Sequence, residues 1–103
     1  MTWAQHFTEL EALPPTRLGD ADALGALLVA AAGAMGATPL APPAVRAGPG
    51  CWTAALLCAD GHIVLHTWPD DGRCLVNVAS QTAAAVERGF DVITRRLGAT
   101  VSP

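Results

Sequence analysis

At 103 residues the chain is long enough for one small domain, which we take to span residues 1–103. Hydrophobic residues make up 51% of the sequence and charged residues only 15%, a balance that excludes intrinsic disorder. The formal net charge is −3 and the six basic residues are scattered arginines. We therefore expect no nucleic-acid-binding surface and no nucleic-acid partner. With so few charged residues, a domain of this size is expected to have some apolar surface that a partner covers. A second copy of the chain is the simplest partner.

The cysteines and the N-terminal half indicate the cellular setting. Cys51, Cys58 and Cys74 are odd in number and lack Cys-x-x-Cys spacing, so we expect buried thiols rather than disulfides or a zinc site. Residues 23–45 carry no charge, but alanines, glycines and prolines make this stretch a core helix followed by a loop, not a membrane span. No secretory signal is visible, which predicts a cytoplasmic protein with no membrane partner.

The first half of the chain predicts a strand, a helix and an edge strand. Residues 3–13 alternate between apolar and polar side chains and stop at a Pro-Pro pair, which is typical of a strand. Asp20 and Asp22 offer capping side chains for a helix that Gly36 ends. Residues 38–46 contain three prolines, so a strand there belongs at the edge of a sheet. The buried stripe expected from helical spacing is Leu24, Leu27, Leu28, Ala31 and Met35.

Three further strands are predicted in the second half. Residues 51–59 are nearly all apolar, as in a central strand, and residues 60–61 break the run. Residues 62–68 form the next strand. The Pro-Asp-Asp-Gly sequence at 69–72 is a turn suited to a tight hairpin, and residues 73–79 alternate as the third strand.

A second helix and a short last strand complete the pattern. Ser80 is the expected N-cap of a helix that ends at Gly98, with residues 99–101 as a final strand. The helix's expected inner face is Ala83, Val86, Phe90, Ile93 and Leu97. This order of elements predicts an α+β two-layer sandwich, in which an antiparallel sheet carries two helices packed on one face. The other face of the sheet would need a cover.

The stretch that contains the predicted strand 62–68 carries a family signature. Residues 60–69 read Asp-Gly-His-Ile-Val-Leu-His-Thr-Trp-Pro. The stretch resembles the signature of the S-adenosylmethionine decarboxylase family in its bacterial and archaeal pyruvoyl-dependent form. There, Glu-Ser-His, three further residues and His-Thr-Trp-Pro follow one another. The predicted order of elements is similar to that family's over most of the chain, and the resemblance implies its fold and a cleft at this strand pair.

The resemblance implies a definite chemistry for these positions. In family enzymes the serine attacks the preceding carbonyl, the chain is cut there, and the serine becomes a pyruvoyl group. That group forms a Schiff base with S-adenosylmethionine and accepts electrons during the decarboxylation that supplies spermidine synthesis. Here Gly61 stands at the serine position, Gln81 at the proton-donating cysteine and Asn77 at an acidic residue. We therefore expect an uncleaved chain with no pyruvoyl cofactor that is inactive as a decarboxylase.

The two histidines of the stretch can be interpreted either as ligand-binding residues or as structural residues. His66 corresponds to the family histidine that assists cleavage. Here it either contacts a ligand or is a half-buried side chain satisfied by backbone or by Asp70. His62 and His66 lie four residues apart on a strand, about 13 Å from each other, so they cannot share one ion and no metal site is predicted.

The other residues of the predicted cleft also have two interpretations. Trp68 shares the face of the histidines and either stacks on a flat ligand or packs in the core or an interface. Asp60 and Gly61 either line the cleft or form a kink between two strands. The candidate cleft residues are Asp60, Gly61, His62, His66, Trp68 and Gln81.

From these features we expect a binding or regulatory protein that forms a homodimer. Its ligand would be a nucleoside or an amine, and an active decarboxylase paralogue is a second possible partner through mixed dimers. Two other functions stay open. One is an enzyme of different, non-pyruvoyl chemistry that uses His62, His66 and Asp60 as acid–base groups in the same cleft. The other is a structural or partner-binding module.

Overall fold

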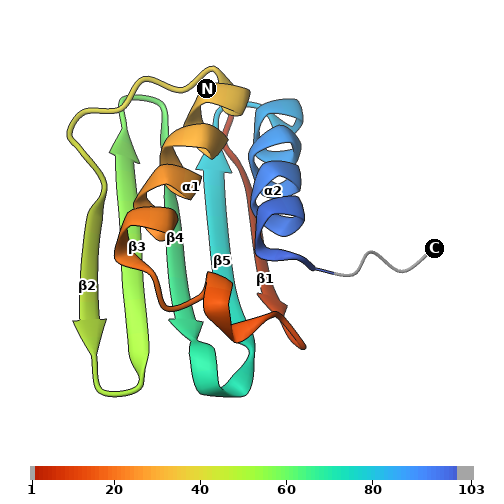
Figure 1. The fold of residues 1–103 in the computed structure, drawn as a ribbon. Helices are drawn as coiled ribbons and strands as arrows, with labels where there is room; N and C mark the ends of the chain where they lie inside the picture. Colours follow the sequence, from red (N-terminus) through yellow and green to blue (C-terminus); the bar gives the residue numbers. More distant parts are fainter. Residues whose placement is uncertain (1, 100–103) are drawn as a thin grey trace.

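The computed structural model describes residues 2–99, which form two layers, an antiparallel sheet and two helices on one of its faces (Figure 1). The sheet order is β1-β5-β4-β3-β2. The elements are β1 (Ala4–Leu10), α1 (Ala21–Met35), β2 (Ala44–Gly48), β3 (Cys51–Cys58), β4 (Gly61–Trp68), β5 (Arg73–Ser80) and α2 (Ala83–Leu97). The predicted α+β two-layer sandwich is confirmed.

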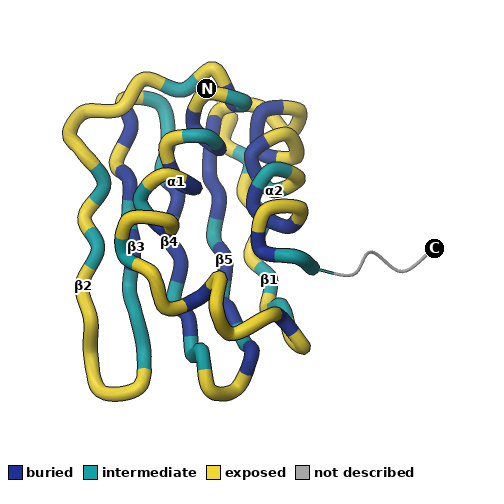
Figure 2. Tube along the Cα trace, viewed as in Figure 1, coloured by how far each residue is buried: buried dark blue, intermediate teal, exposed yellow. Residues whose placement is uncertain are grey.

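The core lies between the sheet and the helices. Alternation in β4 and β5 buries one side of each strand, with Ile63, Leu65, Val76 and Val78 all inaccessible to solvent. α1 packs over β3 and β2, and α2 packs over β5 and β1. In Figure 2 the dark blue segments follow β3, β4, β5 and parts of the two helices, whereas the edge strand β2 is mostly yellow.

Side chains and glycines define the helix ends. The carboxylate of Asp20 accepts a hydrogen bond from the backbone N–H of Ala23 at 3.1 Å, and Gly36 ends α1 in the left-handed conformation, as predicted. Gly98 ends α2 in the same way. The predicted N-cap of α2 is wrong. Thr82 caps α2, because Ser80 is still paired in the sheet with β1 and β4 and lies buried there.

Several predicted boundaries also shift. β1 ends at Leu10, three residues before the expected end, and the chain then turns through Ala12 at a positive φ of 56°. β2 begins only at Ala44, after the prolines that cannot donate to a sheet. Residues 69–71 form a 3-10 turn rather than a two-residue hairpin. Of the predicted last strand, residue 99 is not in a strand, and residues 100–101 lie outside the described residues.

The inner face of α2 differs in part from the predicted stripe. Val86, Ile93 and Leu97 are buried as expected, but Phe90 is only half-buried and Ala83 is exposed. The ring of Phe90 instead stacks on His6 of β1, with centroids 3.8 Å apart. Neither helix of the described chain is long and apolar enough to cross a membrane.

Candidate functional site

The six predicted cleft residues lie in two places. His62, His66 and Trp68 project from β4 onto the sheet face opposite the helices, which we call the open face. Asp60, Gly61 and Gln81 lie instead at the end of the sheet where β3 turns into β4 and β5 ends, at the top of Figure 1. The strand register places Gly61 opposite Ser80, so Gln81 follows directly at this end and is exposed.

Gly61 occupies a position where no side chain fits. Its backbone pairs with Cys58 on one side and with Ser80 on the other, at a φ of 159°. A Cβ atom there would lie 2.9 Å from the carbonyl carbon of Ala79, closer still to its oxygen, and 3.1 Å from the Cα of Ser80. These are backbone atoms of β5, which is paired on both sides, so they cannot rotate away as a side chain could. Gly61 therefore lacks the serine hydroxyl, and in addition the contact with β5 leaves no room for a serine side chain in this conformation.

Asp60 holds the neighbouring loop rather than a ligand. Its Oδ1 accepts a hydrogen bond from the backbone N–H of Thr38 at 3.3 Å, and the N–H of Ala59 donates to the carbonyl of Thr38 at 2.9 Å. These contacts fix the segment after α1 against the β3–β4 turn. Asp60 is therefore separated from the histidines of the open face, and the structure does not bring the three proposed acid–base groups together.

The histidines of the open face have separate partners on neighbouring strands. The Nε2 of His62 lies 2.7 Å from the Oδ1 of Asn77, whose Nδ2 donates to the Oε1 of Gln5 at 3.2 Å. The Nδ1 of His66 lies 3.1 Å from the Oγ1 of Thr53. Backbone or Asp70 was the expected structural partner of His66, and that expectation is wrong, because Thr53 faces His66 directly across the β3–β4 pair.

Trp68 is part of a cluster at the other end of β4. The guanidinium carbon of Arg73 lies 4.7 Å from the centre of a Trp68 ring, and the ring of His66 is 6.5 Å away. The Nε of Arg73 also lies 3.3 Å from a carboxylate oxygen of Glu9. Arg73 is the first residue of the strand predicted for residues 73–79. It belongs to β5, and strand pairing with Trp68 explains its position.

The open face carries apolar side chains and a shallow hollow. The hollow has a volume of about 330 Å³ and is lined by Phe7, Val64, His66, Leu75 and Asn77. Phe7 is 65% exposed, and Leu57, at the β3 side of the same face, is 62% exposed. Among the described residues no helix or loop covers these side chains. The arrangement can bind a flat or apolar partner, and the His62–Asn77 and His66–Thr53 pairs offer polar groups to it.

Nothing in residues 2–99 assembles a metal-binding group of three or more His, Cys, Asp or Glu side chains. Cys58 and Cys74 are buried, as predicted, but Cys51 is only half-buried at the start of β3. Burial raises the pKa of the Cys74 thiol from 9.0 to about 12. For Cys58, burial and then the nearby charge of Asp60 raise the pKa.

The Cys74 thiol gives a prediction for alkaline pH. Because the unfolded thiol ionises near pH 9 and the folded one near 12, the unfolded state binds fewer protons between these values. Stability should therefore fall as pH rises from 9 towards 12, by at most about 1.4 kcal/mol per pH unit from this group. Urea unfolding at several pH values measures the slope, which should be smaller in Cys74→Ala. An equal slope in that variant would contradict the assignment.

Comparison with known proteins identifies the class and then the family. The two-layer fold is shared with the crystal structure of the adenosylmethionine decarboxylase from Aquifex aeolicus VF5. The match has a TM-score of 0.87 and 22% sequence identity, and it covers 97% of this chain and 83% of that one. The comparison with curated protein sequences found no match. Residues 4–102 match the family described as S-adenosylmethionine decarboxylase, and the chain belongs to this family.

Proposed function

We propose that this chain is a binding member of its family that forms no pyruvoyl group and does not decarboxylate S-adenosylmethionine. The observation that carries this proposal is the position of Gly61. A pyruvoyl group requires a side-chain hydroxyl or thiol next to the bond that is cut. Gly61 has neither, and the backbone of Ala79 occupies the space that a side chain would need.

Two further positions support the loss of catalysis. Gln81, at the position of the proton-donating cysteine, carries an amide, which is too weak an acid to donate a proton in catalysis near neutral pH. Asn77, at the position of an acidic residue, carries no charge and hydrogen-bonds with His62 and Gln5. The rival enzyme of different chemistry has less support, because Asp60 hydrogen-bonds to Thr38 on another part of the fold.

The binding surface in this proposal is the open face, and its occupant is a chain of the same fold. A second copy gives a homodimer, and an active decarboxylase paralogue gives a mixed dimer through which the chain would regulate spermidine synthesis in the cytoplasm. Exposed Phe7 and Leu57, together with Val64 and Leu75, supply the apolar contact that such a dimer needs. The hollow beside His66 would take the nucleoside or amine part of a small ligand.

Carbon dioxide release tests the catalytic part of the proposal. The purified chain, incubated with S-adenosylmethionine labelled in its carboxyl group, should release no more labelled carbon dioxide than buffer does. An active family decarboxylase serves as the positive control in the same assay. Release of labelled carbon dioxide above the buffer level by this chain alone would contradict the proposal. A change in the rate of the active enzyme on adding this chain would support mixed-dimer regulation.

A further inference from the structure

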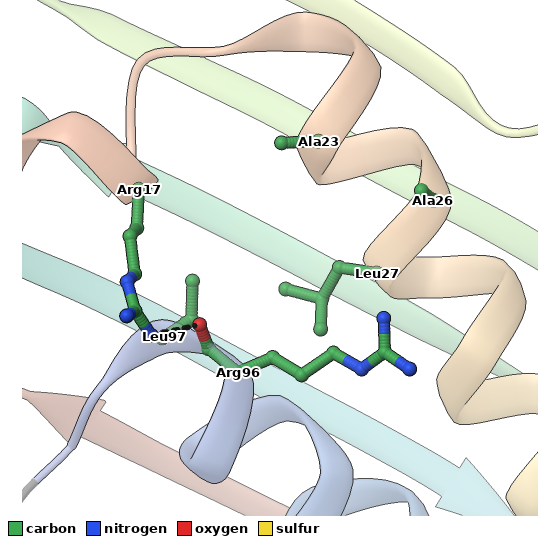
Figure 3. A pocket seen from close by; sticks show the side chains of 6 residues that line it. All are labelled: Arg17, Ala23, Ala26, Leu27, Arg96 and Leu97. Carbon is green, nitrogen blue, oxygen red and sulfur yellow. Dashed lines mark hydrogen bonds between the residues drawn. The ribbon is translucent and has the colours of Figure 1, made fainter.

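A hollow of about 500 Å³ lies at the seam between α1 and α2, in the helix layer and away from the open face. Its lining residues are Arg17, Ala23, Ala26, Leu27, Arg96 and Leu97. Figure 3 shows the side chain of Leu27 reaching into the hollow, with Arg17 on one side of it and the guanidinium of Arg96 on the other. A second hollow of about 270 Å³, lined by Ala30, Val92, Arg95 and Arg96, adjoins the first through Arg96.

The α1 side of the seam carries mostly alanines, with Leu27 as a larger side chain among them. Ala23, Ala26 and Ala30 recur along the side of α1 that borders α2, whereas Leu24 and Leu28 are buried in the core. Methyl side chains are too short to meet α2 across this gap. The chain therefore leaves an apolar trough of a size that suits a small ligand.

The charge at the seam is positive. The Nη1 of Arg17 donates to the backbone oxygen of Arg96 at 2.9 Å, which holds this guanidinium in place while its other N–H donors stay available. Within residues 2–99 the guanidinium of Arg96 has no hydrogen bond or ion pair, whereas Arg95 pairs with Asp91 at 2.9 Å. Among residues 2–99, no acidic side chain lines either hollow.

We propose that this seam binds an elongated organic anion, a carboxylate with an aliphatic or aromatic body. The apolar body lies over Leu27 and Leu97, and the carboxylate accepts hydrogen bonds from the guanidinium of Arg96, with Arg17 as the second cation. Charge-assisted bonds from guanidinium to carboxylate are among the stronger polar contacts in proteins. The site is independent of the open face, so it stands or falls separately from the proposed dimer.

Decanoate is a suitable probe, used with the full chain at concentrations below those at which it forms micelles. Amide chemical shifts should change along the seam between α1 and α2, and decylammonium should bind at least tenfold more weakly. Arg96→Gln should weaken decanoate binding about tenfold, the effect of one lost charge-assisted bond. Ala26→Phe keeps both arginines but fills the hollow, and should abolish binding at the seam.

Arg46→Gln is the matched control. Arg46 is exposed on the edge strand β2, so its removal changes the net charge equally and should leave decanoate affinity unchanged. The proposal is overturned by undetectable decanoate binding, or by equal binding of decylammonium. Unchanged affinity in both Arg96→Gln and Ala26→Phe, or shifts confined to the strands of the open face, would overturn it as well.

Discussion

Gly61→Ser is expected to destabilise the fold by about 2–4 kcal/mol and to leave the chain uncut. The added Cβ meets the carbonyl group of Ala79 and the Cα of Ser80, which are backbone atoms of β5, a strand paired on both sides. Relieving this contact requires β4 and β5 to separate where they are paired. The substitution also places a side chain at a φ of 159°, which residues other than glycine rarely adopt.

Gly33→Ser is the matched control for this experiment. Gly33 lies on the exposed side of α1, and a Cβ there would meet nothing within 4 Å. Serine is a slightly better helix former than glycine, so this variant should be as stable as the parent or marginally more stable. Urea unfolding measures both variants, and denaturing mass spectrometry detects any cut chain. Self-cleavage of Gly61→Ser would show that the site had lost only its hydroxyl. It would contradict the inference that the backbone of Ala79 leaves no room for a side chain at this position.

Phe7→Glu and Leu57→Glu are each expected to convert a dimer into a monomer. Phe7 lies on β1 and Leu57 on β3, and both project from the open face with more than half of their surface exposed. In a symmetric dimer one substitution places two carboxylates in the apolar contact, and both must lose water. The dissociation constant should rise at least about a hundredfold, which corresponds to about 2.7 kcal/mol.

Val29→Glu provides the comparison for the open-face variants. Val29 is 51% exposed on α1, in the helix layer, so this variant adds the same charge at a similarly exposed apolar position. It should remain dimeric. Size-exclusion chromatography with light scattering measures the mass of all four proteins. A monomeric parent, or dissociation by Val29→Glu but not by Phe7→Glu or Leu57→Glu, would contradict open-face dimerisation.

Local signals in the sequence predicted much of the fold. The strands predicted at residues 62–68 and 73–79 correspond to β4 and β5, and the capping roles of Asp20, Gly36 and Gly98 are confirmed. The start of α2 was harder, since both Ser80 and Thr82 are good N-caps. The choice between them depends on how far β5 stays paired with its two neighbours, which is a tertiary property.

The candidate site was predicted less completely, because its contacts depend on strand register. The exposed face of His62, His66 and Trp68 follows from alternation alone. Their partners do not, since this strand register places Thr53 opposite His66 and Asn77 diagonally across from His62. The lack of space at Gly61 likewise arises from β5, a strand that begins twelve residues later in the sequence.

The intact mass of the denatured, purified chain shows whether the chain forms a pyruvoyl group, because pyruvoyl formation in this family requires the chain to be cut. We expect one species with the mass of the uncut polypeptide and no reaction with a hydrazide that labels carbonyl groups. Two polypeptides divided between Asp60 and Gly61, or a hydrazide-reactive group at the start of the second one, would contradict it.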